Sequence, residues 1–170
     1  MTKLRKKLGL VPLVVAALVA GGGAAAFAQR QLVGRPEVSV SLAGTVERGG
    51  QRLALDRVES VHPGEILEWQ IVSSNEGTGA ARDYKAVGHI PTGTAFVADS
   101  AEGEAGSVVT YSIDGGKTFS TQPILEEQQP DGTVKRVPAP VSMYTEVRYE
   151  WSDALAAGGK LSASYKVRVK

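Results

Sequence analysis

The side chains that could bind a metal ion are few and scattered along the chain. Asp99, Glu102 and Glu104 form a short acidic cluster, and carboxylate oxygens close together in sequence suit calcium. The cluster lacks the regular aspartate spacing of a calcium loop, so a solvated acidic loop is the favoured interpretation. His62 and His89 stand beside turns, and the chain has no cysteine to complete a zinc site. We therefore expect no metal or cofactor, with the three acids as the remaining calcium candidates.

No group of residues has the spacing of a catalytic motif. The serines do not occur in a G-x-S-x-G elbow, and the glycines fall at turns without the lysine and Ser/Thr ending of a phosphate loop. Nucleophilic, acid–base and metal chemistry each need several such groups in one constellation. The sequence therefore predicts no catalytic residue and a protein that is not an enzyme.

One short motif between two strand-like runs has a clear physical meaning. The segment 112–119, SIDGGKTF, fits the S-x-D-x-G-x-T-aromatic pattern and is similar to the Asp-box of sialidase-like propellers. Asp114 can accept hydrogen bonds from the backbone of the turn, and Gly116 allows a positive φ. A propeller needs many repeats, whereas this chain has one copy. The motif therefore predicts a structural turn rather than a glycosidase.

The N-terminus has the composition of an export signal. Four basic residues precede an apolar run from Leu8 to Ala20, and Ala26-Phe27-Ala28 fits the pattern that signal peptidase cleaves. We predict a signal peptide over 1–28, so that the protein is secreted or extracytoplasmic, in the periplasm, cell envelope or cell surface. The alternative is an uncleaved anchor, because 8–28 approaches the length of a bilayer span.

The charge balance changes once this segment is set aside. The chain has 19 Lys and Arg against 18 Asp and Glu, and residues 1–28 hold four of the bases and no acid. The remainder carries 15 bases against 18 acids, a net charge of −3. No basic face is implied, so nucleic acid is not an expected partner. Membrane contact is expected only through residues 8–28, if they are uncleaved.

Alternation with a period of two dominates the rest of the chain. Apolar residues alternate with polar ones in 38–42, 67–71, 147–151 and 161–170, and no stretch after residue 28 has a sustained helical period. We predict an all-β fold, a β-sandwich of about seven to nine antiparallel strands, on the strand count and turn spacing. The sandwich covers 37–170 after a short lead, 29–36. Residues 122–142 are expected to form a long hairpin or arm.

The stretch 61–100 organises this prediction. Leu67, Trp69 and Ile71 alternate in one strand, and a second strand-like run follows the Gly-rich turn at 73–79. We expect the two runs to pair as a hairpin around that turn, which the chain leaves at Pro91 and Gly93. A further strand is expected at 53–58.

Several turn motifs in this stretch resemble a known family. They are Pro63-Gly64-Glu65, Ser74-Asn75-Glu76-Gly77, and Ile90-Pro91 with Gly93-Thr94. Together they resemble the conserved-repeat family of bacterial surface proteins known as domain of unknown function 11. The resemblance implies an immunoglobulin-like sandwich that is exported and has no agreed activity. The expected structural turn residues are Pro63, Gly64, Asn75, Gly77, Pro91 and Gly93, together with Asp114 and Gly116 of the Asp-box-like turn.

Two functional hypotheses follow from the sequence. The first is an exported, non-catalytic structural or adhesive module of the bacterial cell envelope or surface. It would act through contacts with other envelope or surface proteins, or with itself by addition of a strand to a sheet edge. The alternative is a carbohydrate- or calcium-dependent ligand-binding module that uses the acidic loop and the arm.

Overall fold

The structure is a computed structural model that describes residues 34–104 and 106–170. The chain divides into two units, Met1–Leu32 and Val33–Lys170, and the described residues belong to the second. The predicted signal segment 1–28 and residues 29–33 of the predicted lead lie outside the described residues. All statements about the fold below concern the second unit.

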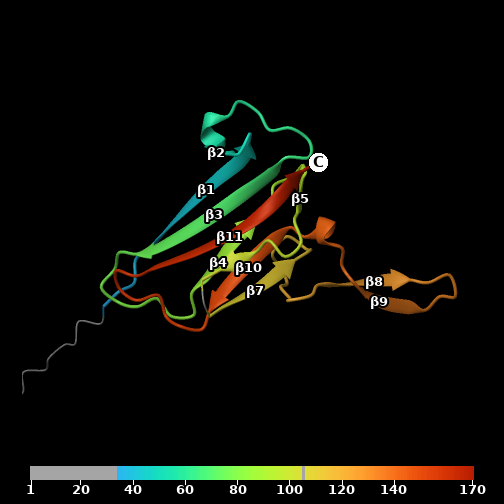
Figure 1. Cartoon of the computed structure of the whole chain (residues 1–170). Coiled ribbons are helices and arrows are strands. Elements are labelled where there is room, and N and C mark those ends of the chain that lie inside the picture. The colour runs from blue at the N-terminus through green and yellow to red at the C-terminus, as the bar shows by residue number, and fades with distance from the viewer. Residues whose placement is uncertain (1–33, 105) are drawn as a thin grey trace, which may run out of the picture. The chain divides into compact units, whose positions relative to one another are not determined.

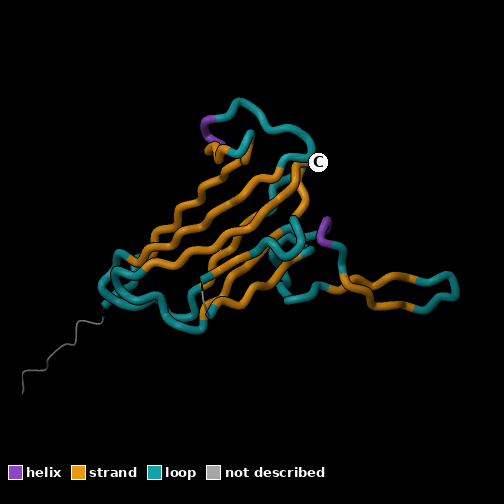
Figure 2. Tube along the Cα trace, in the orientation of Figure 1, coloured by secondary structure: helices purple, strands orange, loops and turns teal. Residues whose placement is uncertain are grey.

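The described residues form two antiparallel sheets that face each other (Figures 1 and 2). The large sheet has the order β2-β1-β3-β11-β5, and β6 also pairs with β11. Its strands are β1 (Val38–Arg48), β2 (Gln51–Ala54), β3 (Ile66–Asn75), β5 (Thr94–Phe96), β6 (Glu102–Gly103) and β11 (Lys160–Val169). The small sheet has the order β4-β10-β7, with β4 (Lys85–His89), β7 (Ser107–Ser112) and β10 (Glu146–Trp151). The predicted β-sandwich is confirmed.

The two strands of the stretch 61–100 do not form the predicted hairpin. β3 pairs with β1 on one side and β11 on the other, so both of its edges are occupied. β4 pairs instead with β10 in the opposite sheet. The chain from Asn75 to Lys85 is therefore a crossover between sheets. The hairpin prediction was wrong because alternation identifies strands but does not identify their neighbours.

Two tyrosines connect the sheets through the core. Tyr149 of β10 donates its hydroxyl proton to the carbonyl oxygen of Ser164 at 2.6 Å, and Tyr165 of β11 donates to that of His89 at 2.6 Å. Both rings are almost completely buried, and Val147 and Val167 pack with them in the same core cluster. Burial raises the pKa of both phenols, that of Tyr165 to about 12.

The strand predicted at 53–58 ends early. β2 stops at Ala54, and a single 3₁₀ turn, η1 (Leu55–Arg57), follows. Leu55 then packs over Gly44 of β1. A side-chain carbon added at Gly44 would lie 2.5 Å from Cδ1 of Leu55 and 2.9 Å from the ring of Trp69. The missing side chain at residue 44 thus lets η1 fold over the sheet.

The segment predicted as an arm forms a separate two-stranded hairpin. β8 (Ile124–Gln128) pairs with β9 (Val134–Pro138), and the hairpin extends away from both sheets (Figure 2). At its tip, the carboxylate of Asp131 accepts hydrogen bonds from the backbone N–H and the hydroxyl of Thr133. A short 3₁₀ turn, η2 (Val141–Met143), leads back to the small sheet.

Candidate functional site

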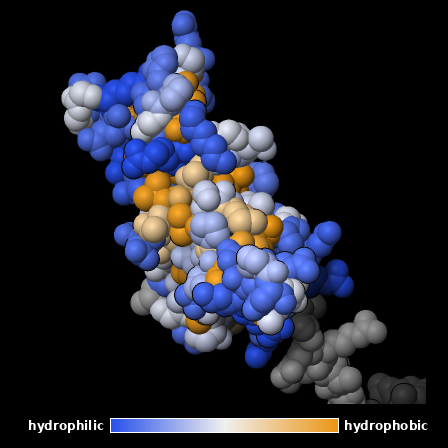
Figure 3. All heavy atoms as spheres, turned by 90° about the vertical axis from the view of Figure 1, so that its right-hand side faces the viewer, coloured by the Kyte–Doolittle hydropathy of each residue, from blue (hydrophilic) through white to orange (hydrophobic). Residues whose placement is uncertain are grey.

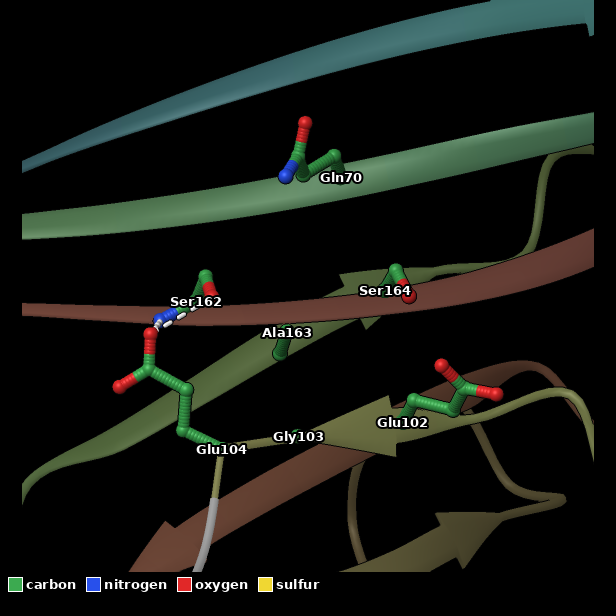
Figure 4. Close-up of a pocket in the computed structure, with 7 residues that line it drawn as sticks. All are labelled: Gln70, Glu102, Gly103, Glu104, Ser162, Ala163 and Ser164. Carbon is green, nitrogen blue, oxygen red and sulfur yellow. Dashed lines mark hydrogen bonds between the residues drawn. The ribbon is translucent and has the colours of Figure 1, made fainter.

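Two of the three acidic residues proposed as calcium ligands, Glu102 and Glu104, border a shallow polar hollow of about 230 Å³ beside β11 (Figure 4). The carboxylate of Glu104 accepts hydrogen bonds from the backbone N–H of Ser162 at 3.1 Å and from its hydroxyl at 2.7 Å. Glu102 lies on the other side of Gly103, and Figure 4 shows its carboxylate directed away from that of Glu104. Asp99 is in a separate tight turn with a φ of 56°.

These acids do not lie together in a group of three possible metal ligands among the described residues. Within 34–104 and 106–170, no three potential His, Asp or Glu ligands gather at a distance that could hold an ion. The structure therefore does not bring the three calcium candidates together. Asp99 lies in its own turn and Glu104 is bonded to Ser162, so the carboxylates stay apart although they are close in sequence.

The predicted turn residues lie at turns and crossovers of the chain. Gly64, Gly93 and Gly116 have φ values of 90°, 84° and 82°, a backbone conformation that residues with a side chain rarely adopt. Pro63 precedes the first of these glycines. The carbonyl oxygen of Pro91 accepts a hydrogen bond from the backbone N–H of Thr94 at 3.0 Å.

In the Asp-box-like turn, the carboxylate of Asp114 is held by four donors. It accepts the hydroxyl protons of Ser112 and Thr118 and the backbone N–H groups of Lys117 and Thr118. These bonds, led by that of the Thr118 hydroxyl, hold the pKa of Asp114 far below its ordinary value. Because the carboxylate is bonded within the turn, we interpret Asp114 as a structural residue.

Asn75 is buried, with 1% of its surface exposed, and it joins three segments. Its Oδ1 accepts the backbone N–H of Glu37 at 3.0 Å and of Gly77 at 3.1 Å. Its Nδ2 donates to the carbonyl oxygens of Gly79 at 2.8 Å and Leu155 at 3.0 Å. The amide thus fixes the residues that lead into β1, the crossover after β3 and the turn before β11.

An ion pair holds the loop between η1 and β3. The guanidinium of Arg48 bonds both carboxylate oxygens of Glu65, at 2.7 and 2.9 Å, and also donates to the carbonyl oxygen of Ser60. These bonds, together with the backbone N–H of His62, lower the pKa of Glu65 to about 2.

The acid sensitivity of this ion pair is a testable consequence. Because folding lowers the pKa of Glu65 from 4.5 to about 2, its stabilisation is complete above pH 4.5 and is lost as the pH falls towards 2. Amide hydrogen exchange of residues 58–65 should therefore accelerate over this interval. Arg48→Gln should remove that acid-induced change, whereas Arg52→Gln should leave it in place. If hydrogen exchange in the Arg48 variant depended on pH as it does in the unaltered chain, the assignment would be contradicted.

The free edge of β1 is the most exposed apolar part of the large sheet. β2 pairs with β1 only from Thr45 to Arg48, so residues 38–44 have no strand neighbour on that side among the described residues. Val40 and Leu42 are 59% and 56% exposed. Both lie on the face of β1 that also carries the buried Val46, because side chains two apart share a face. The face that should be inside the sandwich is thus uncovered along this edge.

A pocket adjoins this edge. It has a volume of about 430 Å³, and its walls include Leu42 and Gly44 of β1, Leu55 and Asp56 of η1, and Trp69 of β3. The indole Nε1 of Trp69 is buried and has no hydrogen-bond partner among the described residues. The pocket is mainly apolar with one carboxylate at its border, which is the composition of a binding site.

Large apolar side chains are also exposed elsewhere, at Val87 of β4, Val108 of β7 and Val134 of the arm. Figure 3 looks onto the side from which the arm projects, where polar residues dominate and apolar residues form a band across the middle. We take the free edge of β1 with its pocket as the candidate functional site, because exposed apolar side chains, an unpaired strand edge and a pocket coincide there. Sequence reasoning recognised 38–42 as a strand but missed the pocket, because only η1 folding over Gly44 creates it.

Comparison with known proteins gives one finding, at the N-terminal end. Residues 5–44 match the B12D family, described as the NADH-ubiquinone reductase complex 1 MLRQ subunit. No curated protein and no solved structure matches the chain. The match includes the first seven residues of β1 and leaves the rest of the sandwich unmatched. Within the described residues, no helix has the length and apolar character needed to cross a membrane.

This match corrects several predictions. The assignment to the conserved-repeat surface family is wrong, because the family model that matches is that of a respiratory-complex subunit. The same match contradicts the other functional predictions: an exported adhesive module or its ligand-binding alternative, envelope partners or strand addition between copies, and a secreted or cell-surface location. The turn motifs at 63–94 misled because unrelated sandwiches need the same backbone turns.

Proposed function

We propose that this protein is a non-catalytic accessory subunit of a membrane-bound NADH-ubiquinone reductase complex. The observation that carries the proposal is the match of residues 5–44 to the subunit family of that complex. In this proposal residues 1–28 are retained as an anchor, because a cut after Ala28 would divide the matched segment. The apolar composition of 8–28 is compatible with a membrane setting.

The chemistry of the sandwich supports a role through contacts rather than catalysis. The charged side chains described above are committed to structure: Asp114 to its turn, Glu65 to Arg48 and Glu104 to Ser162. The apolar edge of β1 and the projecting arm instead offer surface for other proteins. An accessory subunit needs such surfaces and no active site of its own.

Co-migration on a native gel tests this function. Membranes of the cell that makes the protein are solubilised in mild detergent, and the gel is stained for NADH oxidation and blotted for this chain. We expect the chain to migrate with the NADH-oxidising band. Leu13→Lys combined with Leu18→Lys should remove it from that band, and Val141→Thr should not. Migration of the unaltered chain entirely apart from the band would contradict the proposal.

A further inference from the structure

One edge of β1 has backbone N–H and C=O groups that no neighbouring strand pairs among the described residues. The carbonyl oxygen of Glu37 accepts the N–H of Glu76 in the neighbouring chain segment at 2.8 Å. Backbone groups alternate in direction along an antiparallel ladder, so those of Val38, Val40 and Leu42 point away from β3. β2 reaches only to Thr45. An extended segment laid along residues 38–44 would pair these groups.

The side chains along this edge specify apolar residues at alternate positions of the incoming strand. Val40 and Leu42 face the same side, and that side continues into the core at Val46. A partner strand with apolar residues on this face would cover them and extend the core outward. The edge of β7 is less available, because Tyr111 already exchanges backbone hydrogen bonds with Ser120.

The pocket specifies a basic side chain at one position. Asp56 lies at its border and forms no ion pair with any described residue. A lysine or arginine stem could lie between Leu42, Leu55 and Trp69 with its charged end at Asp56. The surrounding charge favours such a partner. Residues 1–33 hold five of the 19 bases and no acid, so residues 34–170 carry 14 bases against 18 acids, a net charge of −4.

We propose that the free edge of β1 binds an extended strand of a partner protein, with alternate apolar residues on Val40 and Leu42 and a lysine or arginine in the pocket beside Asp56. The identity of the partner, a subunit of the respiratory complex, rests on the proposed function. The binding chemistry is independent of it. The incoming strand would pair with residues 38–44 of β1, which β2 is too short to reach.

A peptide titration tests the site with the full chain in detergent. The probe is a fluorescent, end-capped peptide of sequence Thr-Lys-Thr-Val-Thr-Val-Thr, which places its lysine at the pocket when it pairs antiparallel with β1, and the matched control carries glutamate in place of lysine. We expect the lysine peptide to bind and to slow amide exchange in residues 38–44. Asp56→Asn should weaken it about three- to fivefold, the range of a partly exposed ion pair. The glutamate peptide should bind more weakly than the lysine peptide to the unaltered chain.

Two further variants separate the edge from the fold. Val40→Pro removes an outward N–H that β3 does not use, and proline is tolerated at such edges. Leu42→Lys places a like charge beside the incoming lysine. Each should weaken binding at least about tenfold, since ladder bonds or apolar contact are lost. Val87→Thr, on an exposed valine of β4, should bind as the unaltered chain does.

Several results would overturn the proposal. They are equal binding of the two peptides, protection at β4 in place of β1, and dimers of the chain alone that Val40→Pro dissociates, which would make a second copy the occupant. Failure of the peptide to bind while the chain still migrates with the NADH-oxidising band would remove this site and leave the proposed function. Peptide binding by a chain that migrates apart from that band would leave this site and remove the proposed function.

Discussion

Replacing Asn75 by alanine should lower the free energy of unfolding by about 2–4 kcal/mol, because four backbone groups, one in a buried bond and three in partly buried bonds, lose their partner at about 0.5–1 kcal/mol each. The groups are the backbone N–H of Glu37 and Gly77 and the carbonyl oxygens of Gly79 and Leu155. Urea unfolding followed by fluorescence of the two tryptophans measures the loss.

Two comparisons make the Asn75 result specific. Asn75→Asp keeps the acceptor oxygen and loses the donor, so it should fall between the alanine variant and the unaltered chain near neutral pH. Ser74→Ala, next to it but half-buried on β3, should change stability by less than about 0.5 kcal/mol. If Asn75→Ala destabilised no more than Ser74→Ala, the amide would not be the junction of the three segments.

Tyr165→Ala should have an equal or larger effect, a loss of about 3–5 kcal/mol, because it empties a fully buried aromatic site. The ring also lies against Gly88 of the opposite sheet, where an added side-chain carbon would come within 2.4 Å of it. Tyr165→Phe keeps the ring and loses only the hydrogen bond to His89, so it should cost about 1–2 kcal/mol.

The phenol of Tyr165 also predicts alkaline sensitivity. Folding raises its pKa from 10.0 to about 12, so its stabilisation is complete below pH 10 and is lost as the pH rises through 12. Stability of the unaltered chain should fall over this range, and Tyr165→Phe should reduce the slope. Parallel pH curves for the two proteins would contradict the burial of this hydroxyl group.

The sequence predicted individual strands, because alternation shows which side chains of a strand are buried. Alternation at 147–151 and 161–170 marks side chains such as Tyr149 and Tyr165, which are in the core. Alternation does not encode which strand lies beside which, and the expected hairpin at 61–100 failed for that reason. The short turn η1 replaced a predicted strand because Leu55 has space to pack over Gly44.

The candidate site was less predictable than the fold. The acids at 99–104 are close in sequence, but the turn at Asp99 and the bonds of Glu104 to Ser162 separate them. The pocket beside β1 combines residues of four elements, and no local motif signals it. Asn75 was expected as a turn residue, and its bond to Gly77 is local, whereas its bond to Leu155 spans 80 positions and has no local sequence signal.

Site-specific photo-crosslinking in native membranes tests the central claim most directly. A photoreactive amino acid is placed at Leu42 on the free edge of β1 and, as the matched control, at Val134 on the exposed arm. The account predicts that the Leu42 probe crosslinks a subunit of NADH-ubiquinone reductase, identified by peptide mass, and that Asp56→Asn reduces the yield. A Leu42 product consisting of two copies of this chain, or of a protein outside the respiratory complex, would contradict it.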